Sequence, residues 1–417
     1  MNYKEVKKCR ICGNSELVPI LNLGNQFLTG VFSRSKKQKI TSGPLELVKC
    51  QEKDTDNFCG LVQLRHSYEY GELYGKNYGY RSGLNQSMID HLNNIVEKIT
   101  RLVSISSGDL IIDIGSNDST LLQAYPSKGP ILVGIDPTGR KFEKYYPKHI
   151  HLIPEFFSAK TVKDKFGKKK AKVITSIAMF YDLENPLNFM GQVYETLAND
   201  GIWVFEQSYM PTMLEQNAYD TVCHEHLEYY RLKQIKWMTD RIGFKIIDIE
   251  FNDVNGGSFC VTVAKKNSSF QENSKLIEKL LREEGNKGLS SLKPYKEFKQ
   301  RVYKHREELR RFIQKIKSDN KLILGYGAST KGNTLLQFCE FNERDIPFIA
   351  EVNKDKFGCY TPGTYIPIIS EEKAKEMKPD YFLVLPWHFR ESFLKREKEY
   401  LSKVGHFIFP LPKLSVI

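Results

Sequence analysis

Two stretches of the chain alternate short apolar runs with amphipathic helical patterns. The first covers residues 85–265 and the second covers residues 321–417. Each stretch opens with an apolar run, a glycine turn and a helical pattern, which is typical of a strand–turn–helix unit. This alternation predicts two separate α/β domains.

A polar segment separates the two stretches. Residues 266–320 are rich in Lys, Arg and Glu and carry apolar residues at helical spacing, which predicts two exposed amphipathic helices that act as a connector. These apolar residues are Leu276, Ile277, Leu280, Leu281, Phe298, Val302, Leu309, Phe312 and Ile313. Residues 1–70 have a different character and hold four of the eight cysteines. We therefore expect domains over residues 1–70, 71–265 and 266–417.

Composition places the chain among ordinary globular proteins. It has 417 residues, of which 41% are hydrophobic and 27% are charged, which excludes a mainly disordered chain or a coiled coil. No apolar run reaches the roughly 20 residues of a membrane-spanning helix, and the N-terminus lacks the apolar core of a secretory signal. We expect a cytoplasmic protein, a monomer or weak oligomer, with no membrane partner.

The net charge of +12 raises the hypothesis that the protein binds nucleic acid. The basic residues are spread along the chain, and acidic residues interleave them, as where Glu283 and Glu284 follow Arg282. Such interleaving is typical of ordinary pairing on a helix surface. No nucleic-acid partner is therefore expected, although an RNA-modifying protein with zinc and basic helices remains an alternative.

Four cysteines near the N-terminus are spaced like metal ligands. Cys9 and Cys12 form a C-x-x-C pair followed by Gly13, and Cys50 and Cys59 come after a long gap. Tetrahedral thiolate coordination draws on two short turns, and four protein thiolates close the shell of a structural zinc. The spacing predicts such a zinc. Four free buried thiols and a redox C-x-x-C motif are the alternatives, but the redox motif belongs at a helix start in a βαβ unit.

A glycine turn follows the first apolar run of the central region. The letters DLIIDIGSND predict a strand over 110–114 and a turn at Gly115, and the next strand ends at Asp136. A carboxylate about 20 residues after such a turn is placed to bind ribose hydroxyls. Asn117 and Asp118 follow in this turn, and the acidic side chain of Asp118 disfavours a pyrophosphate. A ligand with ribose but no phosphate, such as S-adenosylmethionine, fits better; an ordinary α/β turn is the alternative.

A polar cluster lies in the letters YDTVCHEHLEYY. It contains His224, Glu225 and His226, and it could be a metal site, a proton-transfer site or a polar core network. The metalloprotease pattern H-E-x-x-H would need a histidine where Glu228 stands, so that hypothesis is set aside. A histidine beside a carboxylate is a suitable general base. We take all three as candidate catalytic residues and expect the turn at Asn255 to border the same cleft.

A second glycine turn opens the C-terminal stretch, in the letters LILGYGASTKGN. Ser329, Thr330 and Lys331 stand near the start of the predicted helix, where backbone N–H groups and a cation suit a phosphate. The order Lys–Gly excludes a Walker loop. Glu351 follows 24 residues after Gly327, where a carboxylate could bind ribose. The turn predicts a nucleotide site; a plain α/β turn is the alternative.

Taken together, these motifs resemble those of the three-domain sugar C-methyltransferases, which use S-adenosylmethionine to methylate nucleotide-linked deoxysugars. The matching segments, in the family's order, are the cysteine pairs, CGLVQL, YGKNYGYRSGLNQSM, DIGSNDSTLL, GIDP, FEQSYM, CHEHLEYY, NGGSF and GYGASTKGN. Each segment alone is weak evidence for the family. Together the segments are specific for it, and they span nearly the whole chain.

The resemblance implies a small zinc-binding domain, a central Rossmann-like methyltransferase domain and a C-terminal Rossmann-like domain that holds the nucleotide. It assigns the chemistry to Glu225 and His226. It also implies that the Tyr-rich segment serves the site, with Tyr78 and Ser82 toward the methyl donor and Tyr80 toward the sugar. The chain departs from the family pattern at residues 180–182 (Phe-Tyr-Asp) and at Cys223.

The resemblance implies methyl transfer to the carbon beside the ketone of a 4-keto deoxysugar, in the biosynthesis of sugars or cell-surface polysaccharide. His226 would remove the acidic proton, and the resulting enolate would be methylated. The two departures leave O-methylation of a sugar hydroxyl open. A non-catalytic nucleotide-sugar scaffold is a further alternative, against which the intact Asp136 and the His–Glu pair count.

Overall fold

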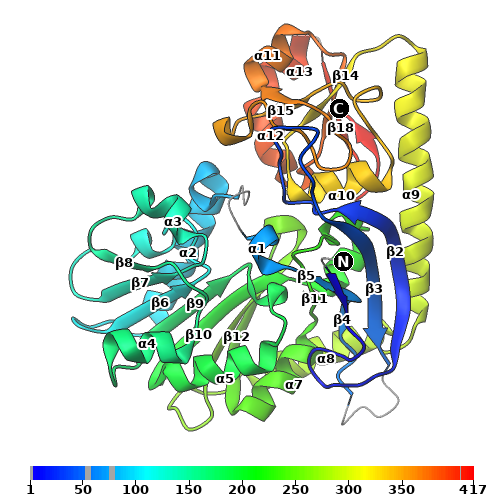
Figure 1. The fold of residues 1–417 in the computed structure, drawn as a ribbon. Coiled ribbons are helices and arrows are strands. Elements are labelled where there is room, and N and C mark those ends of the chain that lie inside the picture. Colours follow the sequence, from blue (N-terminus) through cyan, green and yellow to red (C-terminus); the bar gives the residue numbers. More distant parts are fainter. Residues whose placement is uncertain (1–2, 52–57, 75–79, 404) are drawn as a thin grey trace.

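The computed structural model describes residues 3–51, 58–74, 80–403 and 405–417. Three parts are visible in Figure 1: an N-terminal sheet, a central α/β domain and a C-terminal α/β domain. The α/β fold class and the three-part architecture predicted from the sequence are confirmed. Tyr78, which we expect at the cofactor site, lies outside the described residues.

The central domain is built on a seven-stranded sheet with the order β12-β13-β10-β9-β6-β7-β8. Strands β6 to β10 are parallel, and β13 runs antiparallel to both β10 and β12. The strands are β6 (Leu110–Ile114), β7 (Ile131–Ile135), β8 (Ile150–Ile153), β9 (Ala171–Ile177), β10 (Leu197–Ser208), β12 (Phe244–Asn252) and β13 (Ser258–Lys265). After β8 the chain crosses to the other side of β6 and forms β9, so the strand order reverses at β6. The carboxyl edge beside such a switch point is where α/β sheets bind ligands.

Helices cover both faces of this sheet. Helix α2 (Gln86–Leu102) begins at Asn85, whose side chain accepts the Ser87 N–H, and buries the apolar stripe Met88, Leu92, Ile95, Val96 and Ile99 on one face. The other face is covered by α4 (Ala159–Phe166), α5 (Pro186–Thr196) and α7 (Leu232–Ile242). Shorter helices are α1 (Tyr70–Leu73), α3 (Gly139–Phe142) and α6 (Met210–Glu215).

The N-terminal sheet is completed by a strand from the central region. Its order is β11-β4-β3-β2, all antiparallel, with β2 (Leu17–Phe27), β3 (Ser42–Cys50), β4 (Val62–Leu64) and β11 (Glu228–Tyr229). A separate pair joins β1 (Tyr3–Glu5) to β5 (His66–Tyr68). Because β11 follows the His-Glu-His cluster directly, the N-terminal sheet anchors that cluster.

The C-terminal domain has a six-stranded sheet with the order β16-β15-β14-β17-β18-β19, parallel except for β19. The strands are β14 (Ile323–Tyr326), β15 (Ile349–Glu351), β16 (Ile368–Ser370), β17 (Tyr381–Val384), β18 (His406–Phe409) and β19 (Ser415–Val416). The helices are α10 (Thr330–Phe338), α11 (Glu371–Glu376), α12 (Arg390–Arg396) and α13 (Lys398–Lys403).

Two amphipathic helices join the α/β domains at the predicted place. Helix α8 (Ser274–Asn286) buries Ile277 and Leu280 in the central domain's core. Helix α9 (Lys293–Ser318) runs beside β2 up to the C-terminal domain (Figure 1) and buries its apolar face there. The connector is therefore part of the packed structure, and only its polar face is exposed. No helix in the described part of the chain is long and apolar enough to span a membrane.

A buried ion pair holds the cysteine-rich loop to β11. Arg10 Nε lies 3.3 Å from Glu228 Oε1, and both side chains are almost completely buried. Arg10 also donates from its backbone N–H to Gln63 and from Nη2 to Ser67. Breaking such a pair from one side is costly, because it leaves a buried charge without compensation.

We expect the substitution Glu228→Ala to lower the free energy of unfolding by about 3–5 kcal/mol, as measured by urea denaturation. Glu97→Ala is the matched control, because Glu97 forms an exposed pair with Arg101 on α2 and should cost under about 1 kcal/mol. The double variant Arg10→Met/Glu228→Leu should recover most of the loss. Equal effects of Glu228→Ala and Glu97→Ala would contradict a stabilising role for the buried pair.

Candidate functional site

The four predicted metal ligands come together in the N-terminal part. Cys9 and Cys12 lie in the loop after β1, Cys50 ends β3, and Cys59 precedes β4; their sulfur atoms all lie within 4.8 Å of one another. The Cys9 and Cys59 sulfurs are 3.4 Å apart, and those of Cys12 and Cys50 are 3.6 Å apart. A zinc tetrahedron with bonds of about 2.3 Å has edges of about 3.8 Å. The four thiols therefore fit a structural zinc.

The surroundings of these sulfurs also suit thiolates. The Asn14 side-chain amide donates to the Cys50 sulfur at 3.4 Å. Gly13, at a φ of 74°, ends the turn that carries the first two ligands, and its N–H donates to the Cys9 carbonyl. The Gln234 amide of α7 donates to the Cys59 carbonyl at 2.6 Å. The zinc-binding loops are thus tied to the central domain.

The predicted cofactor residues meet at the carboxyl ends of β6 and β7. The Asn117 N–H donates to Asp136 Oδ2 at 2.8 Å. The segment Ser82–Leu84 covers this turn: the Ser82 N–H donates to Asn117 Oδ1, and the Gly83 N–H donates to Asp118 Oδ2, both at 3.0 Å. The structure thus places Asn117, Asp118, Asp136 and Ser82 together at the edge where an α/β sheet binds its ligand.

Glycine is required at the first position of this turn. Gly115 has a φ of 76°, and a Cβ there would lie 3.1 Å from Cγ of Met179, in the loop after β9. Asn117 and Ser119 also adopt positive φ angles. Met179 therefore packs directly on Gly115, at the switch point beside β6, and leaves little room for a side chain there. A polar, phosphate-free ligand such as S-adenosylmethionine fits this acidic and amide-lined turn.

Two further groups at this turn had no signal in the sequence. Asp113, buried on β6, accepts the Thr175 hydroxyl at 2.6 Å, and burial raises the pKa of Asp113 to about 7. The Tyr146 hydroxyl donates to the Asn117 carbonyl at 2.9 Å and so supports the turn. The predicted substrate residue Tyr80 contributes its carbonyl, which accepts the Asn117 amide at 3.2 Å, while its ring is exposed.

The predicted catalytic segment lies where all three parts of the molecule meet. Glu225 is buried, and the Thr29 hydroxyl of the N-terminal part donates to its Oε2 at 3.3 Å. A Cβ at Gly30 would lie 2.2 Å from Glu225 Oε1 and 3.7 Å from the hydroxyl of Thr330 on α10. Gly30 therefore makes room for the carboxyl group. Burial raises the pKa of Glu225.

His226 is held in one orientation. Its Nδ1 lies 2.8 Å from the Thr221 carbonyl, so Nδ1 carries the proton and Nε2 keeps a lone pair in the neutral ring. The ring packs edge-on against Tyr181, with centroids 4.4 Å apart. Burial, helped by the Lys331 ammonium group, lowers the pKa of His226 to about 3. The neutral, oriented imidazole keeps a lone pair at Nε2 that can accept a proton, although a pKa of about 3 makes it a weak base at neutral pH.

His224 has different surroundings from His226. It is fully buried, its ring meets Tyr68 of β5 edge-on at 4.6 Å, and burial lowers its pKa to about 3. Burial also raises the pKa of Cys223 and of Asp182, the residues at the two departures from the family pattern, and each interacts electrostatically with Glu225. His224 therefore packs in the N-terminal part, whereas Cys223 and Asp182 surround Glu225.

The second glycine turn repeats the geometry of the first. Ser329 caps α10 by accepting the Gly332 N–H at 3.0 Å. Glu351, at the end of β15, accepts the Ala328 N–H at 2.8 Å and the N–H groups of Val352 and Asn353. Glu351 is thus already bonded to the turn, as Asp136 is in the central domain. Helix α10 itself begins beside Glu225.

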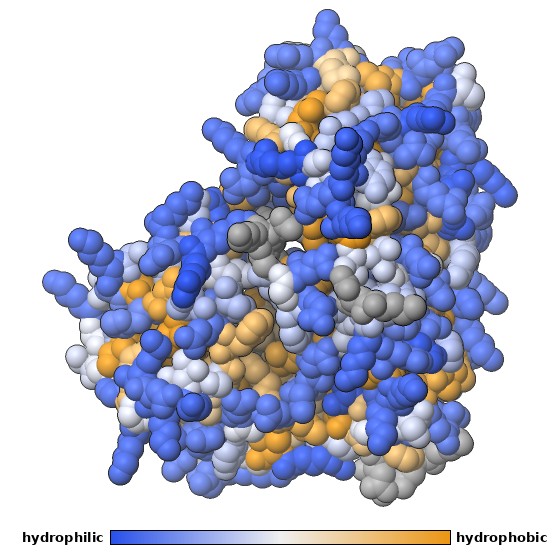
Figure 2. All heavy atoms as spheres, viewed as in Figure 1, coloured by the Kyte–Doolittle hydropathy of each residue, from blue (hydrophilic) through white to orange (hydrophobic). Residues whose placement is uncertain are grey.

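Lys331, which the sequence predicts to bind a phosphate, contacts the central domain. Its Nζ donates to the Asn255 carbonyl, at 2.7 Å, in the loop between β12 and β13. The side chain thus bridges the C-terminal and central domains next to the catalytic segment. The Asn255 backbone makes this contact, and the place of Asn255 at the border of the cleft stays a prediction. Figure 2 shows the hollow between the central and the other two parts, with hydrophobic residues inside and polar residues around it.

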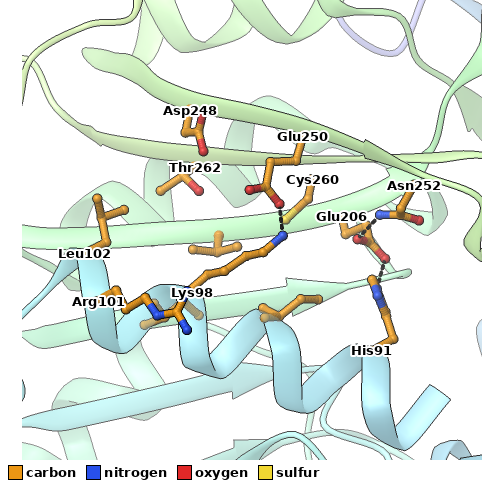
Figure 3. A pocket seen from close by; sticks show the side chains of 13 residues that line it. His91, Lys98, Arg101, Leu102, Glu206, Asp248, Glu250, Asn252, Cys260 and Thr262 are labelled. Atoms are coloured by element: carbon orange, nitrogen blue, oxygen red, sulfur yellow. Dashed lines mark hydrogen bonds and ion pairs between the residues drawn. The ribbon is translucent and has the colours of Figure 1, made fainter. Parts of the chain in front are cut away.

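A pocket of about 250 Å³ lies elsewhere, between α2 and strands β10, β12 and β13 (Figure 3). Glu206 of β10 is buried at one end, and its two oxygens bind His91 and Asn252, each at 2.7 Å. Asn252 in turn accepts the Val254 N–H at 3.0 Å. The pocket contains none of the predicted site residues. Its polar end supports the loop that holds Lys331.

Comparison with known proteins agrees with this arrangement. Three family models match in order: a zinc binding domain (residues 9–74), a methyltransferase domain (86–249) and a C-methyltransferase C-terminal domain (253–412). The C-methyltransferase NovU of Streptomyces niveus is 29% identical over 417 residues, which is 99% of this chain and 97% of that protein. The chain is therefore an S-adenosylmethionine-dependent methyltransferase whose three parts match these three domain models in order.

Solved structures overlap this methyltransferase only in part. LepI in complex with SAM shares 12% identity over 44% of this chain and 54% of its own, with a TM-score of 0.34. A ribosomal protein L11 methylase from Lactobacillus delbrueckii subsp. bulgaricus shares 14% identity over 44% of this chain and 81% of its own, with a TM-score of 0.30. The match to a methyltransferase domain, the match to a zinc binding domain and the four-cysteine cluster together give its cofactors as S-adenosylmethionine and a structural zinc.

We expect the purified enzyme to contain about one zinc ion per chain and Cys50→Ser to lose most of it, because three thiolates and a hydroxyl bind zinc less tightly. Elemental analysis after gel filtration measures the zinc content. Cys260→Ser is the matched control, since Cys260 lies in the pocket between α2 and β13. Full zinc content in Cys50→Ser would contradict the assignment of Cys50 as a ligand.

Proposed function

We propose that the enzyme methylates a carbon atom of a nucleotide-linked 4-keto deoxysugar through an enolate, in the biosynthesis of sugars or cell-surface polysaccharide. The observation that carries the proposal is the neutral, oriented His226, held between the carboxyl edge of the central sheet and the start of α10. The full-length similarity to a C-methyltransferase supports a carbon acceptor.

His226 is the base in this proposal. The proton on the carbon beside the ketone moves to Nε2, because Nδ1 is committed to the Thr221 carbonyl. The electron pair of the broken C–H bond enters the carbonyl group and gives an enolate. S-adenosylmethionine, when bound, supplies the electrophilic methyl group. The new carbon–carbon bond forms as the sulfur–methyl bond breaks, and the ketone is restored.

Glu225 is a positioning residue for this chemistry. Burial favours its neutral form, and Thr29 and Gly30 fix its place beside Thr330. It thereby orients the segment that carries His226. We propose His224, which is packed against Tyr68, as a support of the same segment rather than as a proton carrier.

The remaining site residues divide between the two ligands. Gly115, Asn117, Asp118, Asp136 and Ser82 are proposed to hold the methyl donor, since they surround the turn at the switch point. Ser329, Thr330 and Glu351 are proposed to hold the nucleotide, and Tyr80 and Asn255 to border the sugar. O-methylation is the second candidate. Asp182 and Cys223, where the chain departs from the family pattern, both interact electrostatically with Glu225, so the groups around Glu225 differ from that pattern.

We expect the enzyme with bound S-adenosylhomocysteine to exchange one carbon-bound proton of a 4-keto nucleotide sugar for deuterium in heavy water, and His226→Gln to exchange at least about 100-fold more slowly. NMR measures the exchange. Because the pKa of His226 is lowered to about 3, the base stays neutral and the wild-type rate should not fall between pH 8 and pH 5.5. Methyl transfer to a hydroxyl, without exchange, would establish O-methylation.

We expect Gly30→Ala to lower kcat by at least about tenfold, because the new methyl group would displace Glu225, and even small misplacement of catalytic groups is costly. Methyl transfer to the same 4-keto sugars measures kcat, and calorimetry should show unchanged S-adenosylmethionine binding. Gly191→Ala is the matched control: Gly191 lies in α5, and a Cβ there meets nothing within 4 Å. An active Gly30→Ala enzyme would contradict the positioning role.

A further inference from the structure

Helix α10 brings Lys331 directly to the catalytic segment. Lys331 Nζ donates to the Asn255 carbonyl of the central domain at 2.7 Å. One turn later, on the same side of the helix, the Thr334 hydroxyl donates to the Val222 carbonyl at 3.3 Å. The start of α10 is therefore fixed from two sides against residues 219–227, and the ammonium group lies at this contact.

One carboxyl group and the proposed base interact with this ammonium group. Asp220 is buried and interacts electrostatically with Lys331; its Oδ2 accepts the Trp387 indole N–H at 2.8 Å. Lys331 also acts electrostatically on His226, the proposed base. Lys331 is therefore close enough to His226 to act on a substrate group that His226 deprotonates.

Resting on the proposed function, we infer that Lys331 is a catalytic residue that stabilises the enolate oxygen rather than a ligand of the nucleotide's phosphates. One of its three N–H groups is used by Asn255, which leaves two for the sugar oxygen. As His226 takes the carbon-bound proton, the carbonyl electron pair moves to the oxygen, which accepts a hydrogen bond from Lys331. Burial lowers the pKa of Lys331 and Asp220 opposes this shift; Lys331 donates the hydrogen bond from its protonated form.

The experiment measures deuterium exchange in heavy water for the zinc-containing enzyme with S-adenosylhomocysteine. The probes are nucleoside-diphosphate 4-keto-6-deoxyhexoses that carry thymidine or uridine. At saturating sugar, Lys331→Met should exchange about 100-fold or more slowly, as is usual when one donor to a developing oxyanion is lost. Its apparent KM should change by less than about threefold. Lys331→Arg, which keeps the charge, should recover at least a tenth of the wild-type rate.

Lys321→Met is the matched control, because Lys321 is an exposed lysine at the amino end of β14 and pairs with Asp380. It should exchange at the wild-type rate. Calorimetric binding of S-adenosylhomocysteine shows whether Lys331→Met is folded, and the Arg variant tests the role if the Met variant is not. A raised KM with an unchanged exchange rate would overturn the catalytic role of Lys331 and indicate that Lys331 binds the nucleotide's phosphates instead. A wild-type enzyme that neither exchanges nor methylates any probe would overturn the proposed function itself.

Discussion

The structure depends on the burial of one polar segment, residues 218–231, at the junction of the three parts of the chain. Thr29 and Gly30 of the N-terminal part and Thr330 and Thr334 of α10 all contact it. β11 ties its end to the N-terminal sheet. Such a polar segment is stable in the interior only if its groups are hydrogen-bonded or neutral. Each part of the protein supplies some of the partners, so the site exists only in the assembled chain.

The sequence was most informative where a chemical constraint acts over a short distance. Thiolate ligands need short turns, so Cys9 and Cys12 were visible as a pair, and the four-thiol cluster agrees with the zinc prediction. The turn at Gly115 and the turn before α10 were visible for the same reason, since a tight connection between strand and helix requires glycine. The α/β class followed from the alternation of apolar runs.

Long-range packing was not readable from these patterns. Nothing near Gly30 in the sequence indicates that Glu225, 195 residues later, occupies the space of its missing side chain. His224 and His226 look equivalent as letters, yet one packs against Tyr68 and the other is held by the Thr221 carbonyl. The helical connector was expected to be exposed, and its apolar face could be assigned to a core only once its neighbours were known.

In both α/β sheets a carboxylate at the end of the second strand binds the glycine turn, but the two turns carry different side chains. Asp136 and Glu351 each end the second strand of their unit and accept a backbone N–H from the preceding turn. In the central domain the turn carries Asn117 and Asp118, whereas in the C-terminal domain it leads to Lys331. Burial disfavours charge at the junction: it lowers the pKa of His226 and of Lys331 and raises that of Glu225. A negative charge formed on a substrate there has little water to solvate it. The ammonium form of Lys331, which Asp220 favours, is therefore worth more at this point than on the surface.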